Sequence, residues 1–272
     1  MTSIITAVAV ADSVAADTGI RLTTLAVTYP RFIHSEMMTH RVFSRNASSS
    51  RAIPVKKTID MVVTRMAEPV HWGQNQPGMQ AREELQGWKR AAARLVWRTT
   101  GHLAVLGARL MAALGAHKQI VNRMIEPWSH ITVVISSTEW DNFFALRDHE
   151  DADPTIQVVA RCMRVAMDAS RPRTLQAGEW HLPFLSPLEN LSPQHDMMKR
   201  LSAARCARTS YLTHDKQRPD RAQDYKLFDR LAGAAPQHLS PTEHQATPSG
   251  DTAFHANFRG WKQFRQEVDL AA

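Results

Sequence analysis

The sequence predicts an α+β fold in which helices flank one sheet. Residues 21–29 and 131–136 are rich in β-branched and aliphatic side chains and have the length of buried strands. Residues 82–116 carry apolar side chains at helical spacing, and 140–147 and 154–170 are also predicted helices. Because 43% of the 272 residues are hydrophobic, the chain can bury one large core. We therefore expect the whole chain to form a single domain.

Proline and the apolar spacing set the boundaries of these elements. Pro30 ends the first strand and starts a helix that we expect to run through His40. Residues 82–116 should form one or two amphipathic helices, and residues 247–260 a polar loop with proline and glycine. The apolar residues expected to face the core from 82–116 are Leu85, Trp88, Ala92, Leu95, Leu103, Leu106 and Leu110.

Bulk composition narrows the function without deciding it. The net charge of +7 suits anionic partners such as nucleotides, folate tails or nucleic acid. Cys162 and Cys206 lack Cys-x-x-Cys spacing, which argues against a disulfide framework and a zinc site. The N-terminus lacks the basic region of a signal peptide, and no segment has the roughly 20 apolar residues that span a bilayer. We expect a soluble cytoplasmic protein without a membrane partner or a metal site.

The most informative stretch is residues 40–51, which combines arginines, an imidazole and small polar side chains. A guanidinium is a rigid fork of donors that suits phosphate or carboxylate, and neighbouring hydroxyls can complete an anion cradle. The alternative is a solvated basic loop. The residues concerned are His40, Arg41, Ser44, Asn46, Ser49, Ser50 and Arg51.

This stretch resembles the arginine-rich signature of the flavin-dependent thymidylate synthases. All the residues just named except Ser50 stand at signature positions, whereas Thr39, Ala47 and Ala52 depart from it. Two more segments resemble family motifs in the family's order: residues 122–127, with Arg123, and residues 129–157. The second of these contains an apolar strand, then Asn142, Phe143, Leu146 and Arg147.

Two further resemblances come after the arginine-rich motif, although the family places them before it. Residues 201–211 are similar to the family's opening segment, and residues 238–244, with His238, Ser240 and Glu243, to its Gly-His-x-Ser/Thr-Pro-Phe-Glu-His motif. We interpret this order as a circular permutation, since domain termini are commonly exposed and close together. The alternative is an ordinary helix start with Ser240 as its cap. A single catalytic domain, 1–272, would then carry nucleotide and flavin motifs over 20–165 and a permuted segment over 200–248.

The resemblance implies a mixed or antiparallel helix-flanked sheet and a homotetramer with shared active sites. It implies transfer of a carbon unit from methylenetetrahydrofolate to C5 of dUMP, with FAD as cofactor and NADPH as reductant. Arg147 would polarise the pyrimidine, a route that needs no cysteine nucleophile. The implied nucleotide contacts are Glu36, Ser49, Ser50, Arg51, Arg123 and Arg147. The implied flavin contacts are His40, Arg41, Ser44, Asn46, Asn142, His238, Ser240 and Glu243.

The departures from the family leave the base and the product open. Glu36 stands where the family has a neutral Gln, and its carboxylate would accept from the amino group of cytosine and repel the oxygen of uracil. Otherwise it forms a helical pair with His40, four residues on. dUMP is therefore the default substrate and dCMP the alternative. Because Thr39 replaces a cation, water could trap the carbon unit and give a hydroxymethyl product.

Two loops and one rival class complete the hypotheses. Residues 71–79 and 179–183 each combine a Trp with polar groups, which is typical of a site for a flat heterocycle or of a loop anchored by a buried Trp. Basic charge and seven Trp are also found in nucleic-acid-binding or nucleic-acid-modifying proteins. Four of these Trp, at 88, 97, 128 and 140, stand in apolar contexts, which argues against nucleic acid as a partner.

Overall fold

A five-stranded sheet forms the centre of the molecule. The computed structural model describes residues 4–208 and 220–270. Within them the strand order is β3-β4-β2-β1-β5, with every pair antiparallel except β1 and β5. The predicted mixed sheet is therefore confirmed. Its strands are β1 (Thr6–Ala15), β2 (Arg21–Pro30), β3 (Ser44–Ala47), β4 (His130–Ser137) and β5 (Arg173–Leu175).

Helices cover both faces of this sheet, and the chain adds a small C-terminal set of short strands. The helices are α1 (His34–Met38), α2 (Val55–Thr64), α3 (Gly87–Ala113), α4 (Lys118–Val121), α5 (Asp141–Arg147), α6 (Pro154–Asp168), α7 (Pro187–Asn190), α8 (His195–Ala207), α9 (Arg221–Ala232) and α10 (Phe264–Leu270). The 3-10 segments are η1 (Arg31–Ile33), η2 (Asn122–Trp128) and η3 (Ser240–Glu243). The short strands are β6 (Ala246–Pro248), β7 (Phe254–His255), β8 (Phe258–Arg259) and β9 (Trp261–Gln263).

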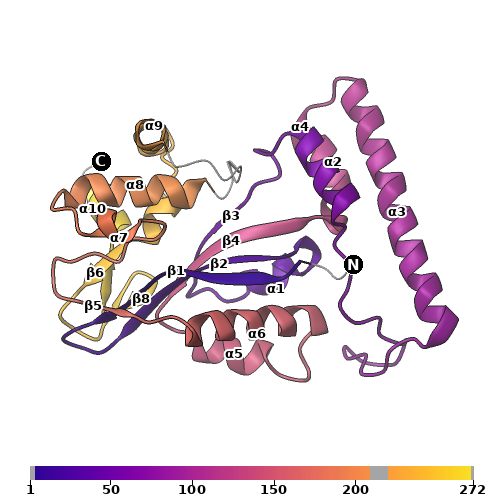
Figure 1. Cartoon of the computed structure of the whole chain (residues 1–272), viewed down its shortest axis with the longest axis horizontal. Coiled ribbons are helices and arrows are strands. Elements are labelled where there is room, and N and C mark those ends of the chain that lie inside the picture. Colours follow the sequence, from indigo (N-terminus) through magenta and orange to yellow (C-terminus); the bar gives the residue numbers. More distant parts are fainter. Residues whose placement is uncertain (1–3, 209–219, 271–272) are drawn as a thin grey trace.

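The two faces of the sheet differ in chemistry because side chains alternate along a strand. Leu25, Val27 and Tyr29 of β2 pack against α5 and α6 in the main apolar core. Val133 and Ile135 of the neighbouring strand β4 belong to the same core. In Figure 1 the two helices lie below the sheet. The lower face of the sheet is therefore closed by apolar packing.

The opposite face carries a row of buried hydroxyls. Thr24 Oγ1 lies 2.6 Å from Ser136 Oγ and 2.8 Å from His181 Nε2, and Ser136 Oγ lies 2.8 Å from His244 Nδ1. His181 Nδ1 lies 2.9 Å from Ser13 Oγ. The C-terminal part of the chain therefore docks on the sheet partly through hydrogen bonds from two buried histidines.

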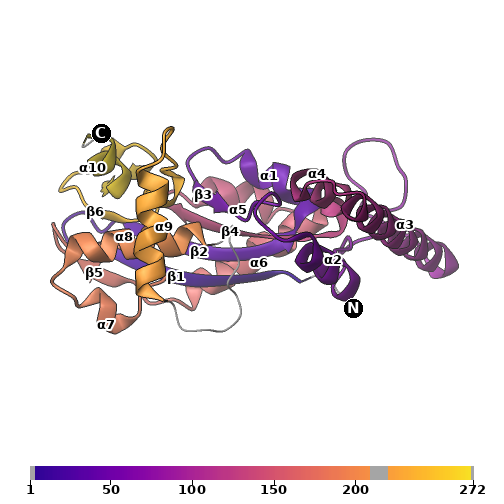
Figure 2. The same ribbon diagram turned by 90° about the horizontal axis from the view of Figure 1, so that it is seen from above.

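Helices α8 and α9 lie above one end of the sheet and α2, α3 and α4 above the other (Figure 1). Seen from above, α9 crosses the strands while α3 extends beyond them (Figure 2). The two groups of helices thus stand on either side of the middle of the sheet, where the candidate site lies. Among the described residues, no helix combines the length and apolarity needed to cross a membrane.

Two expectations about the helices need correction. The helix expected to run through His40 ends at Met38, and Thr39 Oγ1 donates to the Glu36 carbonyl at 2.7 Å, closing the last turn. The stretch 82–116 forms one helix, α3, but most of the residues expected in its core-facing stripe lie exposed. The side of α3 that packs on α2 and η2 instead contributes Gly101, Val105 and Ala108.

Candidate active site

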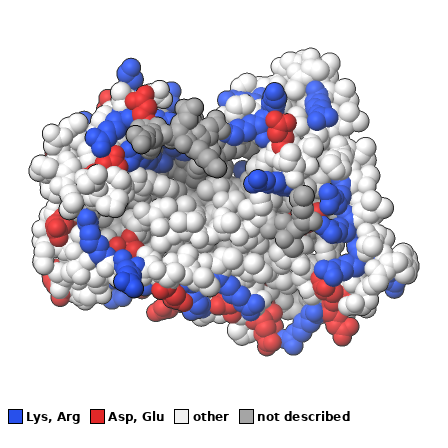
Figure 3. Space-filling view, in the orientation of Figure 1, with Lys and Arg blue, Asp and Glu red and all other residues white. Residues whose placement is uncertain are grey.

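A cationic pocket of about 640 Å³ lies between the two groups of helices. Its described lining contains two cations, one imidazole and no carboxylate, so it suits an anionic group such as phosphate. In Figure 3, Lys and Arg side chains lie on both sides of the hollow at the upper edge of the molecule. The lining residues are Asn46, Ser49, Arg51, Ala52, Lys118, Ala207, Leu231, His238, Ser240 and Pro241.

The pocket joins two motifs that are far apart in the sequence. Asn46, on β3, donates from Nδ2 to the Cys206 carbonyl at 2.6 Å and accepts from Ser240 Oγ at 3.5 Å. His238 lies in the same lining, although it is exposed. The structure therefore brings part of the arginine-rich stretch together with two residues of the displaced motif.

The turn that carries Ser49, Ser50 and Arg51 is held from below by a buried amide. Asn122 Nδ2 donates to the Ser50 carbonyl at 2.7 Å and to the Ile53 carbonyl at 2.9 Å. Because Asn122 is fully buried, this amide fixes the turn against η2. Ser49 and exposed Arg51 then line the pocket, whereas Ser50 is buried.

Lys118, the second cation of the pocket, is a residue that sequence reasoning missed. Its Nζ donates to the Ala52 carbonyl at 3.3 Å, so the ammonium lies beside the Arg51 turn. A single lysine between two helical segments has no pattern that marks it as functional. Only the folded structure, which places Lys118 beside the Arg51 turn, identifies it.

Arg147 forms a second cluster with Glu36, Thr39 and His40. Its Nε donates to His40 Nε2 at 3.1 Å, and its Nη2 donates to Thr39 Oγ1 at 3.0 Å. Its Nη1 lies 3.6 Å from Glu36 Oε2. The alternative interpretation of Glu36, a helical pair with His40, is not found, because His40 lies beyond α1 and accepts from Arg147.

The electrostatics of this cluster follow from burial and from the guanidinium. Burial lowers the pKa of His40, and the charges of Arg147 and Arg45 lower it further. A neutral His40 that accepts at Nε2 carries its proton on Nδ1. Burial raises the pKa of Glu36, with a smaller contribution from Asp153, while Arg147 opposes the shift.

The other expected site residues lie outside both groups. Arg41 and Asn142 are exposed, and Arg123 is exposed on η2. Ser44 is fully buried, and its hydroxyl accepts from Asn257 Nδ2 at 3.1 Å and from a second amide on β9 at 2.9 Å. Glu243 forms an ion pair with Arg265. In this chain Ser44 and Glu243 thus contact the C-terminal segment.

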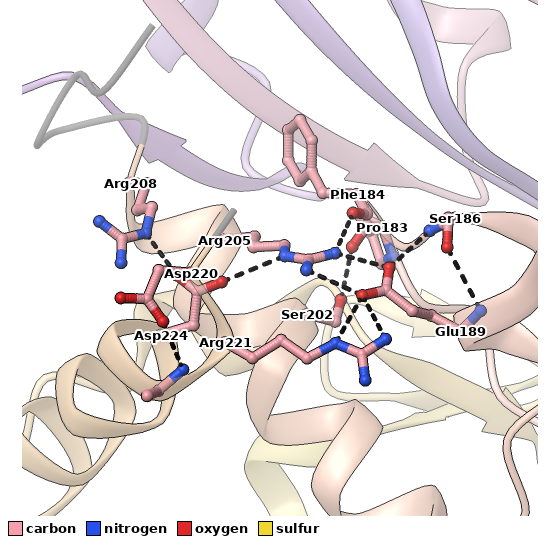
Figure 4. Close-up of polar contacts among 11 residues, drawn as sticks. Pro183, Phe184, Ser186, Glu189, Ser202, Arg205, Arg208, Asp220, Arg221 and Asp224 are labelled. Atoms are coloured by element: carbon pink, nitrogen blue, oxygen red, sulfur yellow. Dashed lines mark hydrogen bonds and ion pairs between the residues drawn. The ribbon is translucent and has the colours of Figure 1, made fainter. Parts of the chain in front are cut away.

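The segment similar to the family's opening motif forms a buried ion network (Figure 4). Arg205 donates from Nη1 and Nη2 to Glu189 at 2.8 and 2.9 Å and from Nε to Asp224 at 3.2 Å. Arg208 also pairs with Asp224, and Arg221 with Glu189. Hydrogen bonds from Arg205 lower the pKa of Glu189 to about 2. The network ties α7, α8 and α9 together. Residues 209–211 of the segment lie outside the described residues.

The remaining candidates have packing roles. Trp72 meets Trp97 edge to face at 6.3 Å, and Trp180 meets Phe264 in the same way at 6.2 Å. These contacts favour the interpretation of 71–79 and 179–183 as loops anchored by a Trp. Cys206 is fully buried, and burial raises its pKa, which disfavours a thiolate nucleophile there.

Comparison with known proteins identifies solved structures of similar fold. No protein-family model matches the chain, and no curated protein sequence matches it. The structure of the UMP/dUMP methylase PolB from Streptomyces cacaoi with 5-Br dUMP has a TM-score of 0.50 and 14% identity, covering 61% of this chain and 90% of PolB. The PolB structure with 5-Br UMP has the same score and identity, over 60% and 88%.

Thymidylate Synthase X from Helicobacter pylori, solved with FAD and dUMP, has a TM-score of 0.38 and 14% identity, over 54% of this chain and 67% of that one. The likeness to PolB concerns three-dimensional structure, since the identity of 14% is low. The comparison with PolB is the one that supports the architecture. The chain has the fold of the UMP/dUMP methylase PolB.

Proposed function

We propose that the chain is an FAD-dependent enzyme that transfers a one-carbon unit from methylenetetrahydrofolate to C5 of a deoxypyrimidine monophosphate. One observation carries this proposal: Asn46, Ser49 and Arg51 line the same cationic pocket as His238 and Ser240, which come much later in the sequence. The pocket lies in a fold shared with a methylase of UMP and dUMP.

The cations of the pocket would bind the phosphate. Arg51 offers a planar fork that fits two phosphate oxygens, and Lys118 adds a point charge beside it. The Ser49 hydroxyl can donate a further hydrogen bond. Since the described lining has no carboxylate, nothing within it repels the anion.

Arg147 would act on the pyrimidine ring. A guanidinium stays protonated at any working pH, so it can stabilise negative charge on a ring oxygen throughout the reaction. Neutral His40 accepts from Nε, and Thr39 accepts from Nη2. These contacts fix the plane of the guanidinium before a substrate arrives, which reduces the reorganisation needed during catalysis.

The residues present fit a flavin dinucleotide, whose phosphates need the same kind of cationic surface. Asn46, His238 and Ser240 would hold it, with His40 and Arg41 from the region of the second cluster. When bound there, a flavin would carry the carbon unit and supply the hydride, with NADPH as its reductant. The pocket volume of about 640 Å³ is in the range of ordinary cofactor sites.

The pocket and the Arg147 cluster share no residue, so one chain need not complete the site alone. We propose a homotetramer in which the Arg147 cluster of one subunit faces the pocket of another. The folate and the nucleotide would then bind at a boundary between subunits. In this arrangement the exposed residues Arg41, Arg123 and Asn142 would contact a neighbouring subunit or a ligand bound at its surface.

The substrate base has two candidates. dUMP is the default, and the position of Glu36 favours dCMP as a second. The Glu36 carboxylate lies beside Arg147 rather than His40. A hydrogen-bond acceptor therefore stands next to Arg147, the residue that would polarise the ring. Such an acceptor suits the amino group of cytosine. The product is a methylated base or, if water traps the carbon unit, a hydroxymethylated one.

Product analysis tests the proposal. The protein is reconstituted with FAD and incubated with methylenetetrahydrofolate, NADPH and either dUMP or dCMP, and the nucleotides are analysed by mass spectrometry. We expect a methylated or hydroxymethylated nucleotide from one of them. A protein that binds no FAD and modifies neither nucleotide would refute the proposal, and binding of single-stranded DNA instead would favour the nucleic-acid class.

A further inference from the structure

Arg45 is a half-buried cation that belongs to neither the pocket lining nor the Arg147 cluster. Its neighbour on β3, Asn46, lines the pocket. Because side chains alternate along a strand, Arg45 faces the other way. Within the described residues its guanidinium makes one hydrogen bond, from Nη1 to the Met37 carbonyl of α1 at 3.1 Å. One strand therefore supplies a side chain to the pocket and the adjacent side chain to the helix that precedes His40.

The bond from Arg45 closes the loop that carries His40. This loop, residues 39–43, connects the C-terminal end of α1 to β3. Within it the Phe43 amide donates to the His40 carbonyl at 3.3 Å. The bond between Arg45 and Met37 joins the strand after the loop to the helix before it. The ends of the loop are thus held together by the side chain of Arg45.

The imidazole of His40 is enclosed by two aromatic rings. It stacks on Phe43, with ring centroids 5.6 Å apart, and meets Phe143 edge to face at 4.9 Å. His40 is only 7% exposed, and its Nε2 accepts from Arg147 Nε at 3.1 Å. A second proton on the ring would remove this acceptor. The bond to Arg147 therefore requires both the position of the loop and a neutral ring.

Two guanidiniums bind successive carbonyls at the end of α1. Arg147 Nη2 donates to the Glu36 carbonyl at 3.4 Å, and Arg45 donates to the next one, that of Met37. The last carbonyls of a helix lack intrahelical partners, so cations there are favourable. Burial lowers the pKa of His40 most, and the charges of Arg147 and then Arg45 lower it further. The Glu36 carboxylate, which would act in the opposite direction, lies 3.6 Å from Arg147.

We propose that Arg45 is a positioning residue for Arg147, because it holds the His40 loop against α1 and so keeps Nε2 of His40 opposite Nε of Arg147. Its charge also favours the neutral ring that this bond requires. The inference rests on the proposed function for what Arg147 does, whereas the arrangement itself needs no ligand. It is therefore testable in the protein alone.

NMR of the ligand-free chain, with histidine labelled with ¹³C at Cε1, tests the arrangement. The signal of His40 is identified by its absence from His40→Gln. In Arg45→Met the pKa of His40 should be higher than in the unmodified protein, since a neighbouring cation is lost, whereas Arg45→Lys keeps the charge and should stay close to the unmodified protein. If Arg45→Met does not fold, Arg45→Gln, which keeps a polar donor without the charge, should show the same rise.

The matched control for the titration is Arg173→Met. Arg173 also donates one hydrogen bond to a carbonyl at 3.1 Å, that of Trp180, but it lies on β5. Its loss should leave the pKa of His40 unchanged. A pKa of His40 that is the same in the unmodified protein and in the folded, uncharged Arg45 variant overturns the proposal.

Kinetics then connect the arrangement to turnover. In the one-carbon assay, Arg45→Met should lower kcat about 10-fold and change KM for the nucleotide by less than about 2-fold, because Arg51 and Lys118 still bind the phosphate. Arg45→Lys should restore part of kcat. An unchanged kcat, or a rise in KM alone, overturns the proposal. An unmodified protein without turnover would refute the proposed function, and the titration of His40 would still decide the role of Arg45.

Discussion

Acid should unfold this protein by protonating three buried histidines, of which His181 and His244 hold the C-terminal part of the chain on the sheet. His181 and His244 are fully buried, and burial lowers the pKa of each from 6.5 to about 3. Burial lowers the pKa of His130 to about 4. In the unfolded chain these groups bind protons near pH 6.5, so below that pH the unfolded state holds more protons than the folded one. Folding stability therefore falls as the pH drops from about 6.5 toward the folded pKa values.

The magnitude is large compared with ordinary folding stability. One pKa unit corresponds to about 1.4 kcal/mol, so at about pH 5 each of the three histidines removes about 2 kcal/mol. The combined loss of about 6 kcal/mol is comparable with the whole stability of many domains, about 5–15 kcal/mol. We expect the midpoint of urea unfolding to fall steeply between about pH 6.5 and pH 5.

The hydroxyl row explains why the folded state rejects the proton. One assignment of hydrogens satisfies the row: His244 Nδ1 donates to Ser136, Ser136 to Thr24, Thr24 to His181 Nε2, and His181 Nδ1 to Ser13. Within the described part of the chain His244 Nε2 has no hydrogen-bond partner, so it keeps its lone pair. A second proton on His181 would sit on Nε2 and face the hydroxyl proton of Thr24. The hydrogen bonds along the row would then have to reverse their direction.

The assay is urea unfolding followed by circular dichroism at several pH values. His244→Asn keeps a donor for Ser136 and removes the titration, so its stability should depend on pH about one third less than that of the unmodified protein. The control is His149→Asn, at an exposed position, which should leave the dependence unchanged. A stability that is flat between about pH 6.5 and pH 5 would refute the reasoning.

Three further predictions concern the arginines and the base. Arg51→Ala and Arg147→Ala should each lower kcat/KM roughly 100-fold or more while circular dichroism stays unchanged, because each loses a charge-assisted contact; near-normal turnover contradicts the assignment. Glu36→Gln should shift preference from dCMP toward dUMP by roughly 5- to 150-fold, while Glu139→Gln, equally exposed and paired with another Arg, should not. Arg205→Met should cost about 3–5 kcal/mol in urea unfolding, since it leaves two buried carboxylates without this partner, and a loss below about 1 kcal/mol would contradict this.

The sequence predicts the central strands well because their signal is local. Residues 21–29 and 131–136 correspond to β2 and β4, which lie in the middle of the sheet. It does not predict β1, whose alanines and polar residues give a weak pattern, and that strand is stabilised by pairing with β2. Helical spacing gives α3 but not which of its sides is buried, because a buried and an exposed apolar stripe have the same period.

The site divides in the same way. The arginine-rich stretch identifies Asn46, Ser49 and Arg51, which do line the pocket. The arginine-rich stretch does not show that His40 accepts a hydrogen bond from Arg147, because the two residues are 107 positions apart in the chain. Lys118 is also missed by sequence analysis, because a single lysine is common on any protein surface and has no distinguishing pattern.

The order of the motifs matters less to the site than the docking of the C-terminal part. Trp261 Nε1 donates to the Ile20 carbonyl at 3.1 Å, and Gly250 lies beside Asp17, so the chain after β6 runs near the start of β2. A chain that ran from this segment directly into β2 would keep Asn46 and Ser240 where they are. The circular permutation stays a prediction, but the proximity meets its geometric requirement. His238 and Ser240 line the pocket only while the C-terminal part stays bound to the sheet through the hydrogen-bonded row. Loss of that row at low pH should therefore also remove activity.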